Sequence, residues 1–236
     1  MGPVNEVCDL LRREDFLPWL PQEMKSDAIK IYVDEAGHAE MSHALIQACE
    51  KYLGIRKIRN IRPAFLATLD SLVQQEEPEF HSLIKLFFVI ISETLITGTL
   101  TKLPGDETVQ QVVRGIAADH ASDEGRHHAY FRNVFEYVWP RLPRVTRLKV
   151  GLLLPDMILA FLQPDSRALA KVLQMFPDDF PDPNPIVREI TASVKTRSGI
   201  RDSAAPTMRM LKDNGVLDFS AEVTNLFVAR SLLASE

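Results

Sequence analysis

The stretch ADHASDEGRHHAYF, residues 118–131, holds three of the six histidines of this 236-residue chain beside three acidic residues. His120, Glu124 and His127 stand at positions i, i+4 and i+7, so on an α-helix they share one face. Apolar residues continue the same stripe in both directions, namely Val113, Ile116, Phe131 and Val134. Three metal-ligating side chains within an apolar stripe predict a metal site that faces the interior of a helical bundle.

The chain has the composition of an ordinary globular protein, with 46% hydrophobic and 25% charged residues. Its net charge of −5 is spread along the sequence, so nothing indicates a nucleic-acid or membrane partner. Cys8 and Cys49 have no paired spacing and the first residues contain no apolar run, so we expect a cytoplasmic protein. The most apolar stretch, residues 83–100, contains Lys85 and Glu93 and therefore predicts a buried helix rather than a membrane span.

Helical signals follow one another along the first part of the chain. Ser26 is expected to begin a long helix that runs to about residue 53, and two more helices are expected at about 63–76 and 78–103. Asp106 or Thr108 is expected to begin the helix that carries the opening motif.

Shorter helices are expected in the C-terminal part, near 144–162, 165–176, 185–197, 203–214 and 220–233. Strand alternation and internal repeats do not stand out anywhere in the sequence. We therefore predict a single all-α domain over residues 1–236. It would comprise a metal-binding bundle at about 24–140 and additional helices at about 141–236.

Two of the long predicted helices carry the pattern Glu-x-x-His, as Glu35 with His38 and as Glu124 with His127. An i, i+3 pair places a carboxylate and an imidazole side by side, where both can bind one ion. Between these helices, Glu93 lies in an apolar helix, where an ionised carboxylate costs several kcal/mol unless it is paired or coordinating. This order of motifs is the one that a dinuclear iron or manganese centre between bundle helices requires.

The remaining histidines have simpler interpretations. Glu40 and His43 form a third Glu-x-x-His, but five residues correspond to about 140° around a helix, so the pair cannot share the face of Glu35. We expect Glu40 and His43 to be exposed. His128 points off the metal-binding stripe and His81 lies one turn into its helix, so we expect neither as a ligand.

These motifs resemble the p-aminobenzoate N-oxygenase family, ferritin-like di-iron enzymes that oxidise aryl amines to nitro compounds. The resemblance rests on YVDEAGHAEMSHALI (32–46), VIISETLITGTL (89–100) and ADHASDEGRHHAYF (118–131), and it extends from about residue 20 to about 215. Its most specific element is the additional histidine before the second Glu-x-x-His, here His120. The resemblance implies a ferritin-like bundle that holds two iron ions, with manganese as the alternative metal. The implied ligands are Glu35, His38, Glu93, His120, Glu124 and His127.

The chain departs from the family at its beginning. The family has one more glutamate ligand on a helix upstream of the first Glu-x-x-His, and few residues precede Glu35 here. Two Fe(II) ions carry four positive charges and the three matching glutamates supply three negative ones, so we expect a fourth carboxylate. Glu6 is our candidate, with Asp9 and Glu14 as substitutes. The other expectation is a chain without the family's N-terminal helix, with a shortened or inactive site.

The resemblance also implies O2 and a small aromatic amine as substrates, with electrons from an external donor. We expect Thr97 to contact the substrate, within apolar walls of Ile90, Leu100 and Phe131 that exclude water. Arg201 is the candidate that would bind the carboxylate of an acidic substrate, because a guanidinium can grip a carboxylate with two hydrogen bonds. A surface arginine is the alternative interpretation.

Acidic residues beside the expected ligands have two interpretations. Asp34, Asp119 and Asp123 could orient ligand imidazoles, or they could form ordinary salt bridges on the helix surface. The sequence does not separate these interpretations.

Two other functions are compatible with the same fold. A ferritin-like protein could oxidise or store iron without an organic substrate, and a shortened relative could have lost the metal altogether. The proline-rich helical tail beyond residue 140 favours a lidded small-molecule site over iron storage. The oligomeric state stays open, with a homodimer as one arrangement.

Overall fold

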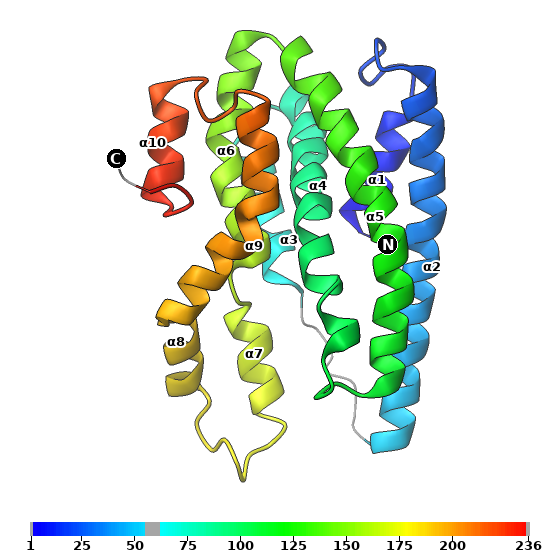
Figure 1. Cartoon of the computed structure of the whole chain (residues 1–236), viewed down its shortest axis with the longest axis vertical. Helices are drawn as coiled ribbons and strands as arrows, with labels where there is room; N and C mark the ends of the chain where they lie inside the picture. Colours follow the sequence, from blue (N-terminus) through cyan, green and yellow to red (C-terminus); the bar gives the residue numbers. More distant parts are fainter. Residues whose placement is uncertain (1, 55–61, 235–236) are drawn as a thin grey trace.

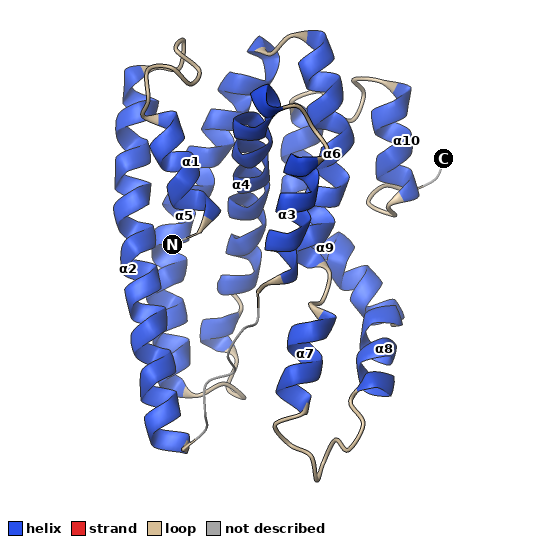
Figure 2. Ribbon diagram, turned by 180° about the vertical axis from the view of Figure 1, so that it is seen from behind, coloured by secondary structure: helices blue, strands red, loops and turns tan. Residues whose placement is uncertain are grey.

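The computed structural model describes residues 2–54 and 62–234, except for the side chains of Leu53, Thr97 and Thr99. These residues form helices and connecting loops without a strand, which confirms the predicted all-α, ferritin-like bundle (Figures 1 and 2). The α-helices are α1 (Pro3–Leu11), α2 (Gln22–Leu53), α3 (Ala64–Gln74), α4 (Pro78–Leu100), α5 (Gln111–Val138), α6 (Arg144–Leu162), α7 (Ser166–Leu173), α8 (Asn184–Ala192), α9 (Val194–Asp213) and α10 (Ala221–Ala229). Two 3₁₀ turns, η1 (Leu103–Gly105) and η2 (Trp139–Arg141), flank α5.

Helix α4 is the central helix of the bundle. It packs along α5 and α6, while α1, α3 and α9 cover its remaining sides. In Figure 1 α4 runs through the middle, with α2 at the outer edge and α7 and α8 below α6 and α9. A helix covered on all sides can be apolar around its whole circumference, which explains the continuous apolar sequence of α4. Among the described residues, no helix is long and apolar enough to cross a membrane.

An aromatic cluster joins α4 to the C-terminal end of α5. Phe87 contacts Phe135 and Trp139 edge to face, with ring centroids 5.6 Å and 6.0 Å away, and all three side chains are buried. Helix α9 is joined to α4 by a buried hydrogen bond from the Thr207 hydroxyl to Thr94 Oγ1, at 3.0 Å. The additional helices therefore share one hydrophobic core with the bundle helices.

Two helices begin at residues other than those predicted. Helix α2 begins at Gln22 after Pro21, and Ser26 lies inside it, where its hydroxyl donates to the Gln22 carbonyl. The proline holds the backbone angle that starts a helix, so the serine is not needed as a cap. Helix α5 begins at Gln111, because the Asp106 carboxylate instead accepts hydrogen bonds from Thr108 in a preceding turn.

The predicted break between residues 197 and 203 is also wrong. Ser193 separates α8 from α9, where its side chain accepts a hydrogen bond from the Thr196 amide. Helix α9 then continues through Pro206, which removes one backbone hydrogen bond without ending the helix. Arg197 and Arg201 consequently lie within a helix and not in a loop before it.

Replacing Phe87 with alanine is expected to destabilise the fold by about 3–5 kcal/mol, because it opens a cavity between α4 and α5. The free energy of unfolding from urea titration measures this change. Val112→Ala on the exposed side of α5 serves as the control, with an expected change within about 0.5 kcal/mol. A similar small change for both variants would contradict the central role of this cluster.

Candidate metal centre

Three helices bring the six expected ligands together in the interior of the bundle. Glu35 and His38 lie on α2, Glu93 on α4, and His120, Glu124 and His127 on α5. Glu93, Glu124, His38 and His127 are buried, while Glu35 and His120 are partly exposed. Long-range packing of α4 and α2 against α5 thus turns three separate sequence motifs into one polar cluster.

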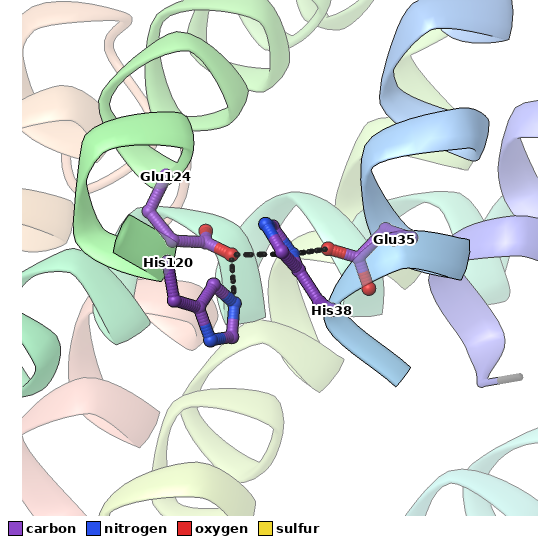
Figure 3. A group of neighbouring side chains, drawn as sticks. All are labelled: Glu35, His38, His120 and Glu124. Carbon is purple, nitrogen blue, oxygen red and sulfur yellow. Dashed lines mark hydrogen bonds and ion pairs between the residues drawn. The ribbon is translucent and has the colours of Figure 1, made fainter. Parts of the chain in front are cut away.

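The donor atoms of this cluster form two overlapping groups. The first group comprises Glu35, His38, His120 and Glu124, and the second comprises Glu35, Glu93, Glu124 and His127. Within each group the donor atoms all lie within 4.8 Å of one another. Glu35 and Glu124 belong to both groups, so each carboxylate could bind two neighbouring ions. Figure 3 shows the side chains of the first group pointing toward one another from α2 and α5.

Individual distances fit donors arranged around common centres. His38 Nδ1 lies 3.3 Å from Glu35 Oε1, and His120 Nε2 lies 2.8 Å from Glu124 Oε1. His127 Nδ1 has three carboxylate oxygens around it, at 3.4 Å (Glu35), 3.6 Å (Glu93) and 3.6 Å (Glu124). Ligands at about 2.1 Å from one ion in octahedral geometry lie about 3 Å from each other, so these separations need little adjustment.

The electrostatics of the cluster reflect this crowding of carboxylates. Burial raises the pKa of Glu93 to about 7, although the neighbouring His127 acts in the opposite direction. Burial alone would lower the pKa of His127, but the carboxylates around it outweigh this effect and raise the pKa to about 12. Burial would likewise raise the pKa of Glu124, but His120 and His127 lower it to about 2. The carboxylates therefore require positive charge among them, and a metal ion can supply it.

Two buried atoms support the fit of a metal ion. Glu124 Oε2 has no hydrogen-bond partner among the described residues, and His127 Nδ1 meets the surrounding carboxylates only at ion-pair distances of 3.4–3.6 Å. Leaving a buried polar atom unsatisfied costs about 1–3 kcal/mol, and coordination would remove that cost. The donor set consists of carboxylates and imidazoles without a thiolate, which suits iron or manganese.

A second set of polar contacts holds the imidazoles in position across the α2–α5 interface. His38 Nε2 on α2 donates to Asp123 on α5 (3.2 Å), and His127 Nε2 on α5 donates to Asp34 on α2 (3.3 Å). Arg126 donates to both aspartates, at 3.1 Å to Asp34 and 2.8 Å to Asp123. Because Nε2 is taken up by the aspartate in each bond, Nδ1 is the ring nitrogen that faces the glutamates and that would bind a metal ion.

The sequence DExxH therefore occurs twice with reciprocal roles, as DEAGH (34–38) and DEGRH (123–127). In each copy, the aspartate orients the histidine of the other copy. Asp119, the third aspartate that was expected from the sequence as a candidate for this role, is exposed on α5. Of the two interpretations for the acidic neighbours, orientation of an imidazole fits Asp34 and Asp123.

The candidates for a fourth carboxylate ligand form ion pairs elsewhere in the structure. Glu6 on α1 is paired with Lys85 at 2.5 Å and is about half exposed, so the structure does not bring it to the cluster. Asp9 and Glu14 are likewise paired elsewhere, with Arg12 and Lys25.

Formal charge can nevertheless balance without Glu6. Three glutamates and two aspartates carry five negative charges, and Arg126 reduces them to four, which equals the charge of two divalent ions. These aspartates lie in the layer behind the ligands and are partly exposed, so solvent also screens them. Charge balance at the centre thus does not require a fourth glutamate.

A cavity of about 200 Å³ adjoins the cluster. Glu35, Glu93, His120 and Glu124 line one part of it, and apolar side chains from α1, α3, α4 and α6 line the rest. The apolar lining consists of Pro3, Val4, Phe65, Phe88, Ile96 and Phe161. An apolar wall beside a metal centre excludes water from the reacting atoms.

The walls differ from those that the sequence predicted. Ile90 and Phe131 are fully buried in the core and are not part of the cavity lining. The cavity lies instead along Phe88, Ser92 and Ile96, the adjoining stripe of α4 at spacing i, i+4, i+8. Sequence periodicity could have suggested this stripe.

Phe65 and Phe161 could not have been found from the sequence. They lie on α3 and α6, far from the ligand motifs in the chain, and no local pattern distinguishes them from other core phenylalanines. Only the packing of these helices against α4 brings both rings to the cavity.

The residues expected to contact the substrate are not among the described residues that line the cavity. The side chain of Thr97 is outside the described residues, so its expected contact with the substrate stays a prediction. Arg201 is exposed on α9 and is not part of the cavity lining, and its role also stays a prediction. Glu40 and His43 are exposed on α2, as predicted.

Asp123→Asn is expected to weaken metal binding about 10–100-fold, because an amide cannot support the His38 imidazole as a carboxylate does. Titration of the metal-free protein with Fe(II) or Mn(II) under argon measures the dissociation constants. Asp119→Asn, one turn earlier on α5, is the matched control and should leave them unchanged. Equal affinities for both variants would exclude the orienting role of Asp123.

Comparison with known proteins agrees with the geometry of this centre. The family model described as P-aminobenzoate N-oxygenase AurF matches residues 18–215, which is most of the chain and includes all six clustered residues. A search of curated proteins found no match. The match confirms the resemblance seen in the three sequence motifs. The chain therefore belongs to the p-aminobenzoate N-oxygenase (AurF) family of ferritin-like di-iron oxygenases.

Proposed function

We propose that this protein is a di-iron oxygenase that uses O2 to oxidise the amino group of an aryl amine. One observation carries the proposal: the six clustered residues form two donor groups that share Glu35 and Glu124. Two carboxylates common to both groups would hold a pair of metal ions side by side, which is the arrangement of a dinuclear centre. Membership of the family supports the aryl amine as substrate.

The protein's own residues would hold and shield the reacting groups. His38, His120 and Glu35 with Glu124 would bind one ion, and Glu93 and His127 with the same two glutamates would bind the other. Asp34 and Asp123 keep the two imidazoles fixed, and the apolar part of the cavity keeps water away. The bound iron would supply the redox chemistry with O2.

The overall conversion requires reducing equivalents from outside the chain. Forming an N-hydroxyl group from one amine and one O2 releases one water and consumes two electrons and two protons. We propose that an external reductase or small carrier supplies these electrons, and that repeated oxidation leads on to the nitro level. Thr97 and Arg201 remain candidates for substrate contact within this proposal.

Iron oxidation without an organic substrate is the competing function for the same cluster. The cavity favours the oxygenase, because an apolar, aromatic wall beside the ligands gives an organic ring a place to bind. Iron uptake alone would require a polar path for the ion instead.

Glu93→Ala is expected to reduce metal binding from two ions to one per chain while the bundle stays folded. Metal analysis after Fe(II) loading measures the stoichiometry, and circular dichroism measures the helical content. The control is Glu6→Gln, whose carboxylate pairs with Lys85 away from the cluster, and it should still bind two ions. Loss of an ion from Glu6→Gln instead of Glu93→Ala would reverse the assignment of these two glutamates.

A single-turnover experiment separates the oxygenase from an iron-oxidising protein. The protein loaded with two Fe(II) is mixed with O2 in the presence and absence of aniline, and products are identified by mass spectrometry. We expect phenylhydroxylamine or its oxidation products to contain oxygen from labelled O2. Oxidation of the iron without any labelled organic product would support the iron-oxidising function.

A further inference from the structure

The cavity beside the metal centre has an aromatic wall assembled from three helices. The Phe65 and Phe161 rings stack with centroids 4.8 Å apart and planes inclined by 24°, and Phe88 lies 5.2 Å from Phe161. Phe88 precedes Glu93 by five residues on α4, which is about 7.5 Å along the helix axis. A benzene ring with an amino group at the metal therefore reaches this wall.

The size of the cavity fits one ring inside it. Its volume is about 200 Å³. A buried apolar cavity of about 150 Å³ is already known to hold a benzene molecule. One substituted ring, with its amino group among the ligands, therefore fits the available space.

The charged residues of the cavity lining also restrict which substrates can bind. Among the described residues, the lining includes no lysine or arginine, and its ionisable groups are Glu35, Glu93, Glu124 and His120. Lys85 and Arg62 line a neighbouring groove, which shares Gly2 and Pro3 with the cavity. Both cations are already paired there, Lys85 with Glu6 and Arg62 with Asp70. A carboxylate on the substrate would thus meet aromatic rings without a cation to pair with it.

Apart from His120, which is an expected metal ligand, the N-terminal turn of α1 is the one source of positive potential among the described residues of the wall. Gly2, Pro3 and Val4 contribute to the lining, and a helix N-terminus carries roughly half a positive charge. Pro3 has no backbone N–H to donate, and half a charge does not neutralise a whole carboxylate. Two divalent ions would not supply the missing charge either, because the surrounding glutamates and aspartates already balance them.

We infer that the substrate of this protein is an uncharged aryl amine, with its ring against Phe65, Phe88 and Phe161, and not an aminobenzoate. The inference rests on the proposed function and narrows its substrate class. Aryl amines are uncharged at neutral pH and keep the nitrogen lone pair that oxidation requires, whereas alkyl amines are protonated. An uncharged ring substituent would avoid the cost of burying an anion.

Two ligands with the same ring and amine test the inference directly. 4-Aminobenzamide is uncharged and 4-aminobenzoate is an anion at pH 7.5, and otherwise their shapes match. Calorimetric titration of the Fe(II)-loaded protein under argon gives both dissociation constants without turnover. We expect the amide to bind at least about tenfold more tightly than the carboxylate, because only the carboxylate must lose its hydration unpaired.

Two matched variants test whether a cation in the cavity lining raises the affinity for 4-aminobenzoate relative to 4-aminobenzamide. Phe65→Arg places a cation in the cavity lining at a partly exposed position, and it should strengthen binding of 4-aminobenzoate about tenfold. Leu66→Arg adds the same charge at the next residue, which lines the neighbouring groove and not the cavity, and it should leave the ratio of the two affinities unchanged.

The outcomes distinguish this inference from the proposed function. If 4-aminobenzoate binds wild-type protein as tightly as 4-aminobenzamide, or if neither ligand binds, the inference is wrong while the measured iron stoichiometry still supports a di-iron centre. If the wild-type chain binds no iron, the proposed function falls and the inference falls with it. A tenfold preference for the amide in iron-loaded protein supports both.

Discussion

Burial of Glu93, Glu124 and His127 in the contact between α4 and α5 is the constraint on which the rest of the structure depends. Charged groups in a protein interior are tolerated only where opposite charge meets them, and here three glutamates surround one histidine that cannot balance them alone. This arrangement is costly as a purely structural feature and favourable as a metal site. The surrounding aromatic core provides the rigidity that keeps the groups together in spite of that cost.

Helices α2 and α5 each supply an aspartate that accepts a hydrogen bond from a histidine of the other helix, and these bonds form a second layer of contacts around the cluster. Each DExxH copy supplies a glutamate and a histidine to the cluster and an aspartate to the opposite copy, so the two helices cannot move apart without loosening both imidazoles. Arg126 joins the two aspartates at the outer edge of this interface. With two divalent ions bound, the same aspartates would contribute the charge that a fourth glutamate would otherwise supply. Charge balance and ligand orientation are thus two effects of one set of contacts.

The cavity adjoins the polar cluster and would hold the proposed substrate beside it. Its floor of carboxylates and imidazoles and its wall of phenylalanines come from different helices, and the additional helix α6 supplies part of that wall through Phe161. Helix α6 is therefore part of the site and not an appendage to the bundle. Helix α1 closes another side through Pro3 and Val4. An aromatic lining without lysine or arginine among its described residues would select for the charge of a substrate as well as for its shape.

The sequence by itself determined the fold class, the family and the six clustered residues, because helical periodicity fixes which side chains share a face and the order of the motifs fixes which helices carry them. It misjudged helix beginnings at Ser26 and Asp106, where a proline or a local turn outweighed the capping preference. Only the tertiary structure decided that Glu6 pairs with Lys85, that Asp34 and Asp123 support opposite histidines, and that Phe65 and Phe161 meet at the cavity. Such contacts join residues far apart in the chain, and they depend on how whole helices pack, which no local pattern encodes.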